Sequence, residues 1–241
     1  MDINIFKDYD ELSRKTADFI SNFVNNNPKA LLCFPAGDSP LGTFKKLVEY
    51  SNEGIVSFKY CRFVGLDEWV GMEKNNEGSC KYFIYKNLFE PLCIDETNIC
   101  FFDACSKDLI SECKRIDKYI LNNGGIDLML LGVGMNGHIG LNEPGVSFKS
   151  YSHVTELDDI TVKVAQKYFK EKKMIKKGIT LGIKHVMDAK TVVLLANGIK
   201  KADIVKKLAK GEVTNKIPAS ILQMHKNSYL FLDKEAASLL E

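Results

Sequence analysis

Residues 126–134 read IDLMLLGVG, a run of apolar side chains that ends in glycines, and this stretch decides the fold class. A strand with one face in water alternates apolar and polar side chains, whereas a strand covered on both faces is apolar throughout. The stretch shows no alternation, so it predicts a strand buried on both faces. Such strands occur in parallel sheets that carry helices on each side.

Similar apolar runs recur on either side of this stretch, and helical patterns separate most of them. The runs lie at residues 30–34, 61–66, 98–102, 191–196 and 228–232. The helical patterns lie at residues 11–25, 43–50, 80–89, 107–121 and 200–211. The alternation predicts an α/β fold, a single-domain, doubly wound and mainly parallel sheet with helices on both faces, over residues 1–241.

The most irregular region lies around residues 145–177. It follows a proline-glycine break and contains the strongly charged stretch YFKEKKMIKK at residues 168–177. This stretch is typical of a solvated helix face, and a mobile lid over a site is the alternative that the pattern leaves open.

Composition excludes several classes of protein. The chain of 241 residues has 33 basic and 31 acidic side chains, and its net charge of +2 gives no reason to expect nucleic acid or a membrane as a partner. Its N-terminus has no secretion signal, and no run of ~18 apolar residues occurs. We therefore expect a cytoplasmic protein.

Metal and disulfide sites are not expected either. The 7 cysteines are odd in number and form no C-x-x-C pair, which argues against a disulfide framework and a zinc cluster. The 4 histidines, His138, His153, His185 and His225, lack the spacing of metal ligands.

Three glycines after the central strand have the spacing of a dinucleotide-binding turn. Gly132, Gly134 and Gly137 form G-x-G-x-x-G, but that fingerprint requires a helix to follow its third glycine. Pro144 and Gly145 leave no room for one, so a nicotinamide or flavin cofactor is not expected. What remains is a glycine-rich loop that carries polar side chains, namely Asn136, His138, Asn142 and Glu143.

Polar residues at the ends of two strands suggest acid–base chemistry. His138 and Glu143 lie on one loop, where a carboxylate can hold one tautomer of the imidazole, although a purely structural hydrogen bond is the alternative. Asp67 directly follows the apolar run at residues 61–66, as either a helix N-cap or a catalytic base.

A third strand end, PAGDSP at residues 35–40, suits a phosphate. Gly37 and Ser39 offer backbone N–H groups and a hydroxyl between a strand and a helix. Asp38 would repel a phosphate if it pointed inward, so its side chain is expected to face away or to cap the helix. No G-x-S-x-G sequence is present, so a Ser-His-Asp hydrolase is not supported.

Five motifs together resemble one family over nearly the full chain. They are PAGDSPLGTF (35–44), LDEWVG (66–71), GVGMNGHIGLNEPG (132–145), GITLGIKHVMDA (178–189) and KIPASILQMH (216–225). In this order and spacing they resemble the glucosamine-6-phosphate deaminase/isomerase family. Within it, LDEWV, SHVTELD and KIPAS look most like the galactosamine-6-phosphate isomerases (deaminases).

The resemblance implies an enzyme, an amino-sugar-6-phosphate deaminase/isomerase. It would convert a 2-amino-2-deoxyhexose 6-phosphate to the ketose 6-phosphate and ammonia. The galacto preference implies galactosamine 6-phosphate as substrate and tagatose 6-phosphate as product, with glucosamine 6-phosphate and fructose 6-phosphate as the alternative. The terms hydrolase, isomerase and deaminase are all expected to describe the enzyme, and no cofactor is required.

Residue roles follow from the resemblance. Asp67 would be the base that moves a proton between C2 and C1, and His138, supported by Asn136 and Glu143, would open the sugar ring. The substrate phosphate would be bound by Gly37, Asp38, Ser39, Lys201 and Lys167. Relatives occur as monomers and as hexamers, so a homo-oligomer remains an open expectation.

Two departures from the family pattern and two rival functions remain. Asn136 stands where the best-known glucosamine enzymes have an aspartate, and Trp69 stands where they have a tyrosine. A 6-phosphogluconolactonase is disfavoured because Trp69 and IGLNEP replace that family's usual residues. A sugar-phosphate sensor without catalysis is disfavoured by the intact Asp67, His138 and Glu143.

Overall fold

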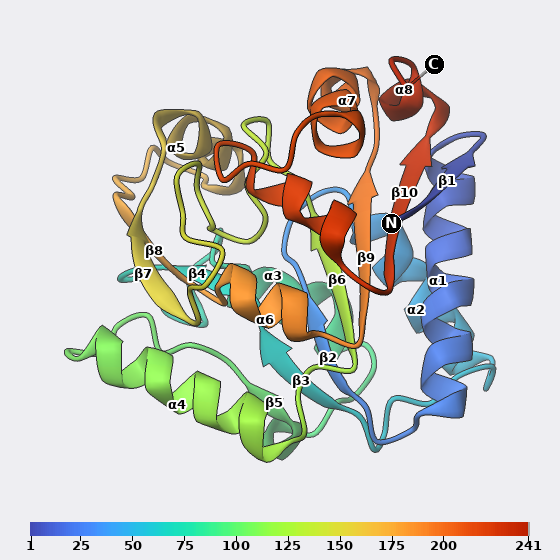
Figure 1. The fold of residues 1–241 in the computed structure, drawn as a ribbon. Coiled ribbons are helices and arrows are strands. Elements are labelled where there is room, and N and C mark those ends of the chain that lie inside the picture. Colours follow the sequence, from blue (N-terminus) through green and yellow to red (C-terminus); the bar gives the residue numbers. More distant parts are fainter. Residues whose placement is uncertain (241) are drawn as a thin grey trace.

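A seven-stranded parallel sheet forms the centre of the molecule (Figure 1). The computed structural model describes residues 1–240. The strand order is β1-β10-β9-β6-β2-β3-β5, and every neighbouring pair is parallel. The strands are β1 (Asp2–Phe6), β10 (Ser228–Asp233), β9 (Thr191–Ala196), β6 (Leu128–Gly132), β2 (Leu31–Phe34), β3 (Arg62–Gly65) and β5 (Ile99–Cys100). The predicted central strand is β6, which lies in the middle of the order.

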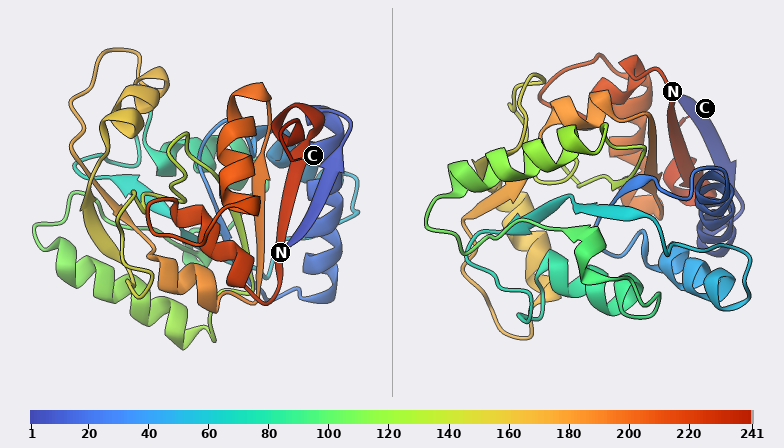
Figure 2. Two further views of the ribbon diagram at one scale, coloured as in Figure 1. Left: turned by 45° about the horizontal axis from the view of Figure 1, so that its top comes forward. Right: turned by 90° about the horizontal axis from the view of Figure 1, so that it is seen from below.

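Helices cover both faces of this sheet (Figure 2), as predicted. One face packs against α1 (Tyr9–Asn26), α2 (Leu41–Asn52), α3 (Cys80–Ile84) and the π-helical turn η1 (Tyr85–Phe89). The other packs against α4 (Leu109–Asn122), α6 (Ile183–Asp188), α7 (Ala202–Lys210), η5 (Pro218–Met224) and α8 (Lys234–Ala237). Within residues 1–240, no helix is long and apolar enough to cross a membrane.

Alternate side chains of the central strand enter the two cores. Leu128 and Leu130 of β6 lie in the core beneath α1 and α2, and Met129 and Leu131 lie in the core beneath α4 and α7. All four are fully buried, and each contributes on the order of 1.5–3 kcal/mol of burial free energy. This explains why IDLMLLGVG shows no polar alternation.

A second, three-stranded antiparallel sheet was not predicted. It has the order β4-β8-β7 and consists of β4 (Asp67–Trp69), β8 (Lys177–Thr180) and β7 (His153–Glu156). Its strands are three or four residues long, and β7 is only partly buried, so neither a long apolar run nor a strict alternation marks it. The sheet holds Asp67 opposite Thr180 of β8.

The charged stretch at residues 168–177 does not form a helix, so the prediction of a solvated helix face is wrong. The helical residues lie before it, in α5 (Asp159–Ala165) and the 3-10 turn η3 (Gln166–Tyr168), and only Tyr168 belongs to both. The Gln166 side chain then bonds both the backbone N–H and the carbonyl of Lys173, which closes a loop instead. The remaining 3-10 turns are η2 (Glu96–Asn98) and η4 (Ile199–Lys201).

Candidate active site

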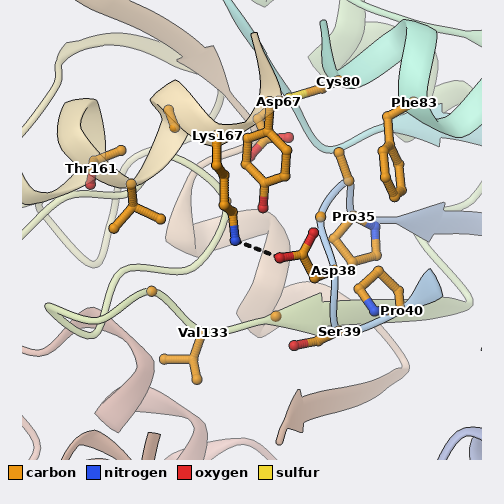
Figure 3. Close-up of a pocket in the computed structure, with 18 of the residues that line it drawn as sticks. Pro35, Asp38, Ser39, Pro40, Asp67, Cys80, Phe83, Val133, Thr161 and Lys167 are labelled. Carbon is orange, nitrogen blue, oxygen red and sulfur yellow. Dashed lines mark hydrogen bonds and ion pairs between the residues drawn. The ribbon is translucent and has the colours of Figure 1, made fainter. Parts of the chain in front are cut away.

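A cavity of about 1090 Å³ lies at the carboxyl ends of the central strands (Figure 3). The loops after β2, β3, β6 and β9 line it, together with residues of α5 and η3. In a parallel sheet these loops converge at one edge, which is the usual place for a ligand. Among residues 1–240, no three His, Cys, Asp or Glu side chains are grouped as metal ligands.

Asp67 is a buried carboxylate in the wall of this cavity. Its exposed fraction is 9%, and burial together with the neighbouring Glu68 raises its pKa to about 7. A carboxylate whose pKa lies near neutrality is suited to remove and return a proton.

Glu68 has a different, structural function. Its carboxylate accepts hydrogen bonds from the Ser79 hydroxyl (2.7 Å) and from the backbone N–H groups of Trp69 (2.8 Å), Cys80 (3.0 Å) and Lys81 (2.9 Å). These bonds hold the start of α3 against β4. Burial nevertheless raises the pKa of Glu68.

The glycines after β6 shape a loop around His138. No helix follows Gly137, and the next regular element is β7. A Cβ atom on Gly134 would lie 2.3 Å from Cε1 of His138, so only glycine leaves room for the imidazole. Gly137 has a φ of +87°, which permits the reversal of the chain. Two of the three glycines are therefore required by the loop and its histidine.

The predicted group around His138 comes together. Its Nδ1 lies 3.5 Å from Oε2 of Glu143, and the Asn136 amide donates to the same Oε2 at 2.9 Å. Burial alone would raise the pKa of Glu143, but the neighbouring imidazole of His138 and the hydrogen bond from the Asn136 amide lower it overall. Glu143 is therefore an ionised acceptor at neutral pH.

Thr161 completes this group and was not predicted. Its Oγ1 lies 3.1 Å from Nδ1 of His138, nearer than the Glu143 carboxylate. Thr161 belongs to the first turn of α5, far along the chain from the loop, and DDITVKVA carries no catalytic motif that would single it out.

The predicted phosphate-binding residues Gly37, Asp38, Ser39, Lys167 and Lys201 all line the same cavity. Gly37 has a φ of +115°, and Ser39 donates a hydrogen bond from Oγ to Oδ1 of Asn197 at 2.6 Å. Asn197 lies in the loop after β9 and also lines the cavity. It is a second residue that sequence reasoning did not assign to the site.

Lys201 is the more deeply buried of the two lysines in this group. It donates from Nζ to the carbonyl of Val133 at 2.6 Å. Burial and the neighbouring charge of Lys167 lower its pKa to about 8. A bound phosphate would raise this pKa again, because its negative charge favours the protonated form of the lysine.

The expected orientation of Asp38 is wrong. Its carboxylate does not cap α2, whose N-cap is Pro40 without a side-chain bond, and it does not face away. It points across the cavity mouth and pairs with Nζ of Lys167 at 2.5 Å (Figure 3). The positive charge of Lys167 compensates the negative charge of Asp38, so this carboxylate can point across the cavity mouth.

The family model for glucosamine-6-phosphate isomerases/6-phosphogluconolactonase matches residues 8–231. The chain belongs to this family. Curated relatives named glucosamine-6-phosphate deaminase include one from Lachnoclostridium phytofermentans, 44% identical over 90% of this chain and 92% of its own. Another, from Clostridium novyi, is 41% identical over the full length of both chains.

Solved structures of the family agree with the fold. The structure of a monomeric glucosamine-6-phosphate deaminase has a TM-score of 0.96 and 33% identity, and covers 99% of this chain and 100% of its own. A 6-phosphogluconolactonase from Trypanosoma brucei has a TM-score of 0.78 and 19% identity, and covers 100% of this chain and 98% of its own. At that identity the likeness concerns the fold alone.

These relatives confirm the predicted enzyme class, an amino-sugar-phosphate deaminase/isomerase. The galacto preference finds no support among them, since both relatives carry the glucosamine name. The prediction of a hydrolase is wrong, because the full-length relatives at 41–44% identity are named deaminases, whereas the lactonase shares only the fold.

Proposed function

We propose that this enzyme converts glucosamine 6-phosphate into fructose 6-phosphate and ammonia. The observation that carries the proposal is the pairing, within one cavity, of a buried carboxylate poised near neutrality with a carboxylate-supported imidazole and two lysines. The names of the full-length relatives favour glucosamine 6-phosphate over its galacto isomer.

His138 opens the sugar ring in this proposal. It accepts the proton of the hydroxyl on C1, the bond between C1 and the ring oxygen breaks, and the ring oxygen takes the proton. The result is the open-chain aldehyde. The Glu143 carboxylate stabilises the imidazolium that forms between the two transfers.

Asp67 then moves a proton between the first two carbons. It removes the proton from C2 while the ammonium group on C2 of the substrate gives a proton to the carbonyl oxygen on C1, and it returns the C2 proton to C1. The product carries a protonated imine at C2, and water adds to this carbon and expels ammonia as ammonium to leave the ketose. Abstraction next to a carbonyl requires a positioned carboxylate, and Asp67 supplies one whose pKa is about 7.

Binding of the substrate phosphate orients the sugar in the cavity. Gly37, Ser39, Lys167 and Lys201 would bind the dianion, so that binding energy far from C1 and C2 orients the reacting carbons. Lys167 would exchange its Asp38 partner for the phosphate.

The test is ammonia release by the purified chain from glucosamine 6-phosphate and galactosamine 6-phosphate, measured side by side. We expect a large preference for the gluco sugar and fructose 6-phosphate as product. A preference for the galacto sugar would overturn the substrate but keep the mechanism. No ammonia from either would overturn both and favour a lactonase or a sensor.

Asp67→Asn tests the base. The amide cannot accept the C2 proton but retains the shape of the side chain, so turnover should be abolished while binding of the sugar phosphate is nearly unchanged. An Asp67→Asn enzyme with most of its turnover number would show that another group is the base.

We further propose that the chain acts as a monomer, as the solved relative at TM-score 0.96 is described. Light scattering at assay concentration tests this, and a stable hexamer would contradict it.

A further inference from the structure

Thr161 is the buried hydroxyl nearest to the imidazole of His138. Its side chain comes from the third residue of α5 and is only 4% exposed. Its Oγ1 lies 3.1 Å from Nδ1, whereas Oε2 of Glu143 lies at 3.5 Å, which is long for a hydrogen bond.

The direction of these bonds follows from what each group can donate. An ionised carboxylate only accepts, so the Glu143 carboxylate beside Nδ1 favours a hydrogen on that ring nitrogen. The Thr161 oxygen, which is the nearer of the two oxygens, then accepts from Nδ1–H. The hydrogen of the neutral ring is thereby placed on Nδ1.

We propose that Thr161 is a positioning residue that accepts a hydrogen bond from Nδ1 of His138 and, together with Glu143, holds the imidazole as the Nδ1–H tautomer. Nε2 is then left unprotonated, and it has no protein hydrogen-bond partner within residues 1–240, while the ring lines the cavity. An unprotonated nitrogen facing the cavity is what the proposed ring opening requires, so this inference rests on the proposed function.

Thr161 lies on the same short segment as Lys167, a proposed phosphate-binding residue. The helical residues of α5 continue directly into η3, which carries Lys167. One short segment therefore presents Thr161 to His138 and Lys167 to the phosphate-binding turn. Asp158 fixes its start by accepting a hydrogen bond from the N–H of Ile160 at 2.8 Å.

The kinetic test replaces the hydroxyl by a methyl group of similar shape. Thr161→Val should lower kcat for ammonia release by about 10- to 100-fold, the loss expected for one hydrogen bond to a charged group, and leave KM nearly unchanged. Thr161→Ser retains the hydroxyl and should retain most of kcat. Thr16→Val is the matched control, because the Thr16 hydroxyl is buried but bonds only a carbonyl of its own helix, Leu12 O.

The spectroscopic test needs no substrate. Among the 4 histidines, the ring ¹⁵N signals of His138 can be assigned by their loss in His138→Gln. Wild type should show the Nδ1–H tautomer, and Thr161→Val should show a mixture of tautomers. If Thr161→Val does not fold, Thr161→Ala takes its place with the same expectation.

The outcomes separate this inference from the proposed function. An active wild type whose Thr161→Val variant keeps both its kcat and its Nδ1–H signal overturns the role of Thr161. Equal losses in Thr161→Ser and Thr161→Val also overturn it, because packing alone would then explain them. A wild type that releases no ammonia overturns the proposed function, while the tautomer measurement still decides the role of Thr161.

Discussion

Asp67 and Glu68 are adjacent in the sequence but have different environments. Consecutive side chains of a strand point to opposite faces, so β4 directs Asp67 to the cavity and Glu68 to the backbone of α3. The cavity wall leaves the Asp67 carboxylate with few donors, whereas Glu68 accepts several hydrogen bonds. The same chemical group therefore serves as a proposed base at one position and as an anchor at the next.

Gly134→Ala is expected to disable His138 without unfolding the chain. The added Cβ would lie 2.3–2.5 Å from three atoms of the imidazole ring, so the ring must move, whereas the Gly134 backbone is not in the left-handed region. We expect kcat to fall by about 100-fold, as for loss of an acid–base group. In a His138→Ala background the same change should have no further effect. A further loss there would show that Gly134 acts by another route.

The pH dependence of kcat/KM should have a narrow maximum. Asp67, with its pKa raised to about 7, must lose its proton to act as a base, so activity should rise as the pH passes through about 7. Lys201, with its pKa lowered to about 8, must keep its proton to bind phosphate, so activity should fall above about 8. The profile of kcat/KM reports these free-enzyme values.

Lys201→Arg tests whether Lys201 causes the predicted fall in kcat/KM at alkaline pH. Arginine remains protonated throughout the range, so the decline above about 8 should disappear even if the maximum rate is lower. If kcat/KM of Lys201→Arg still falls at alkaline pH as in the wild type, another group causes the fall.

At the scale of elements, the segment formed by α5 and η3 lies against the cavity from outside the main sheet. Thr161 and Tyr168 line the cavity, and Lys167 bridges to Asp38 at its mouth. Charge and irregularity in the sequence indicate a lid at residues 145–177, and that remains a prediction about motion.

Lys167→Ala should weaken binding more than chemistry. Its Nζ is placed to exchange Asp38 for the substrate phosphate, so KM should rise by about 10-fold or more while kcat changes little. Lys167→Arg should restore a low KM, because guanidinium also binds phosphate. Lys163→Ala, an exposed change on α5, is the control. Initial rates over a range of substrate concentrations check this, and an unchanged KM in Lys167→Ala would exclude a phosphate contact.

At the scale of the whole molecule, the ligand should stabilise the fold, because the loops of four strands converge on it. Asp67→Asn holds the substrate without turnover in our proposal. At 100 times Kd, bound glucosamine 6-phosphate should stabilise this variant by about 2.7 kcal/mol and raise Tm by about 5–10 °C. Thermal melts with and without the sugar phosphate measure the shift.

Two further thermal melts test whether the rise in Tm comes from binding of the phosphate at Lys201. Adding Lys201→Ala to Asp67→Asn should remove most of it, because the phosphate would lose its most deeply buried cation. An equal shift with and without Lys201 would show that the sugar phosphate binds elsewhere.

The sequence by itself determined the parallel sheet, its helices on both faces and the strand ends that carry the site. Runs such as IDLMLLGVG are local signals, and the carboxyl ends of parallel strands meet at one edge whatever their order. Asp67 and His138 could therefore be placed in one site from the sequence alone. The family resemblance added their roles.

Only the tertiary structure decided the antiparallel sheet, the pairing of Asp38 with Lys167 and the contact of Thr161 with His138. These contacts join residues 129 and 23 positions apart, through loops whose path no local pattern specifies. The strands of the second sheet are too short to show a periodic pattern of apolar residues. Hydroxyl and ion-pair partners depend on distances of a few ångströms, and packing of the whole chain sets those distances.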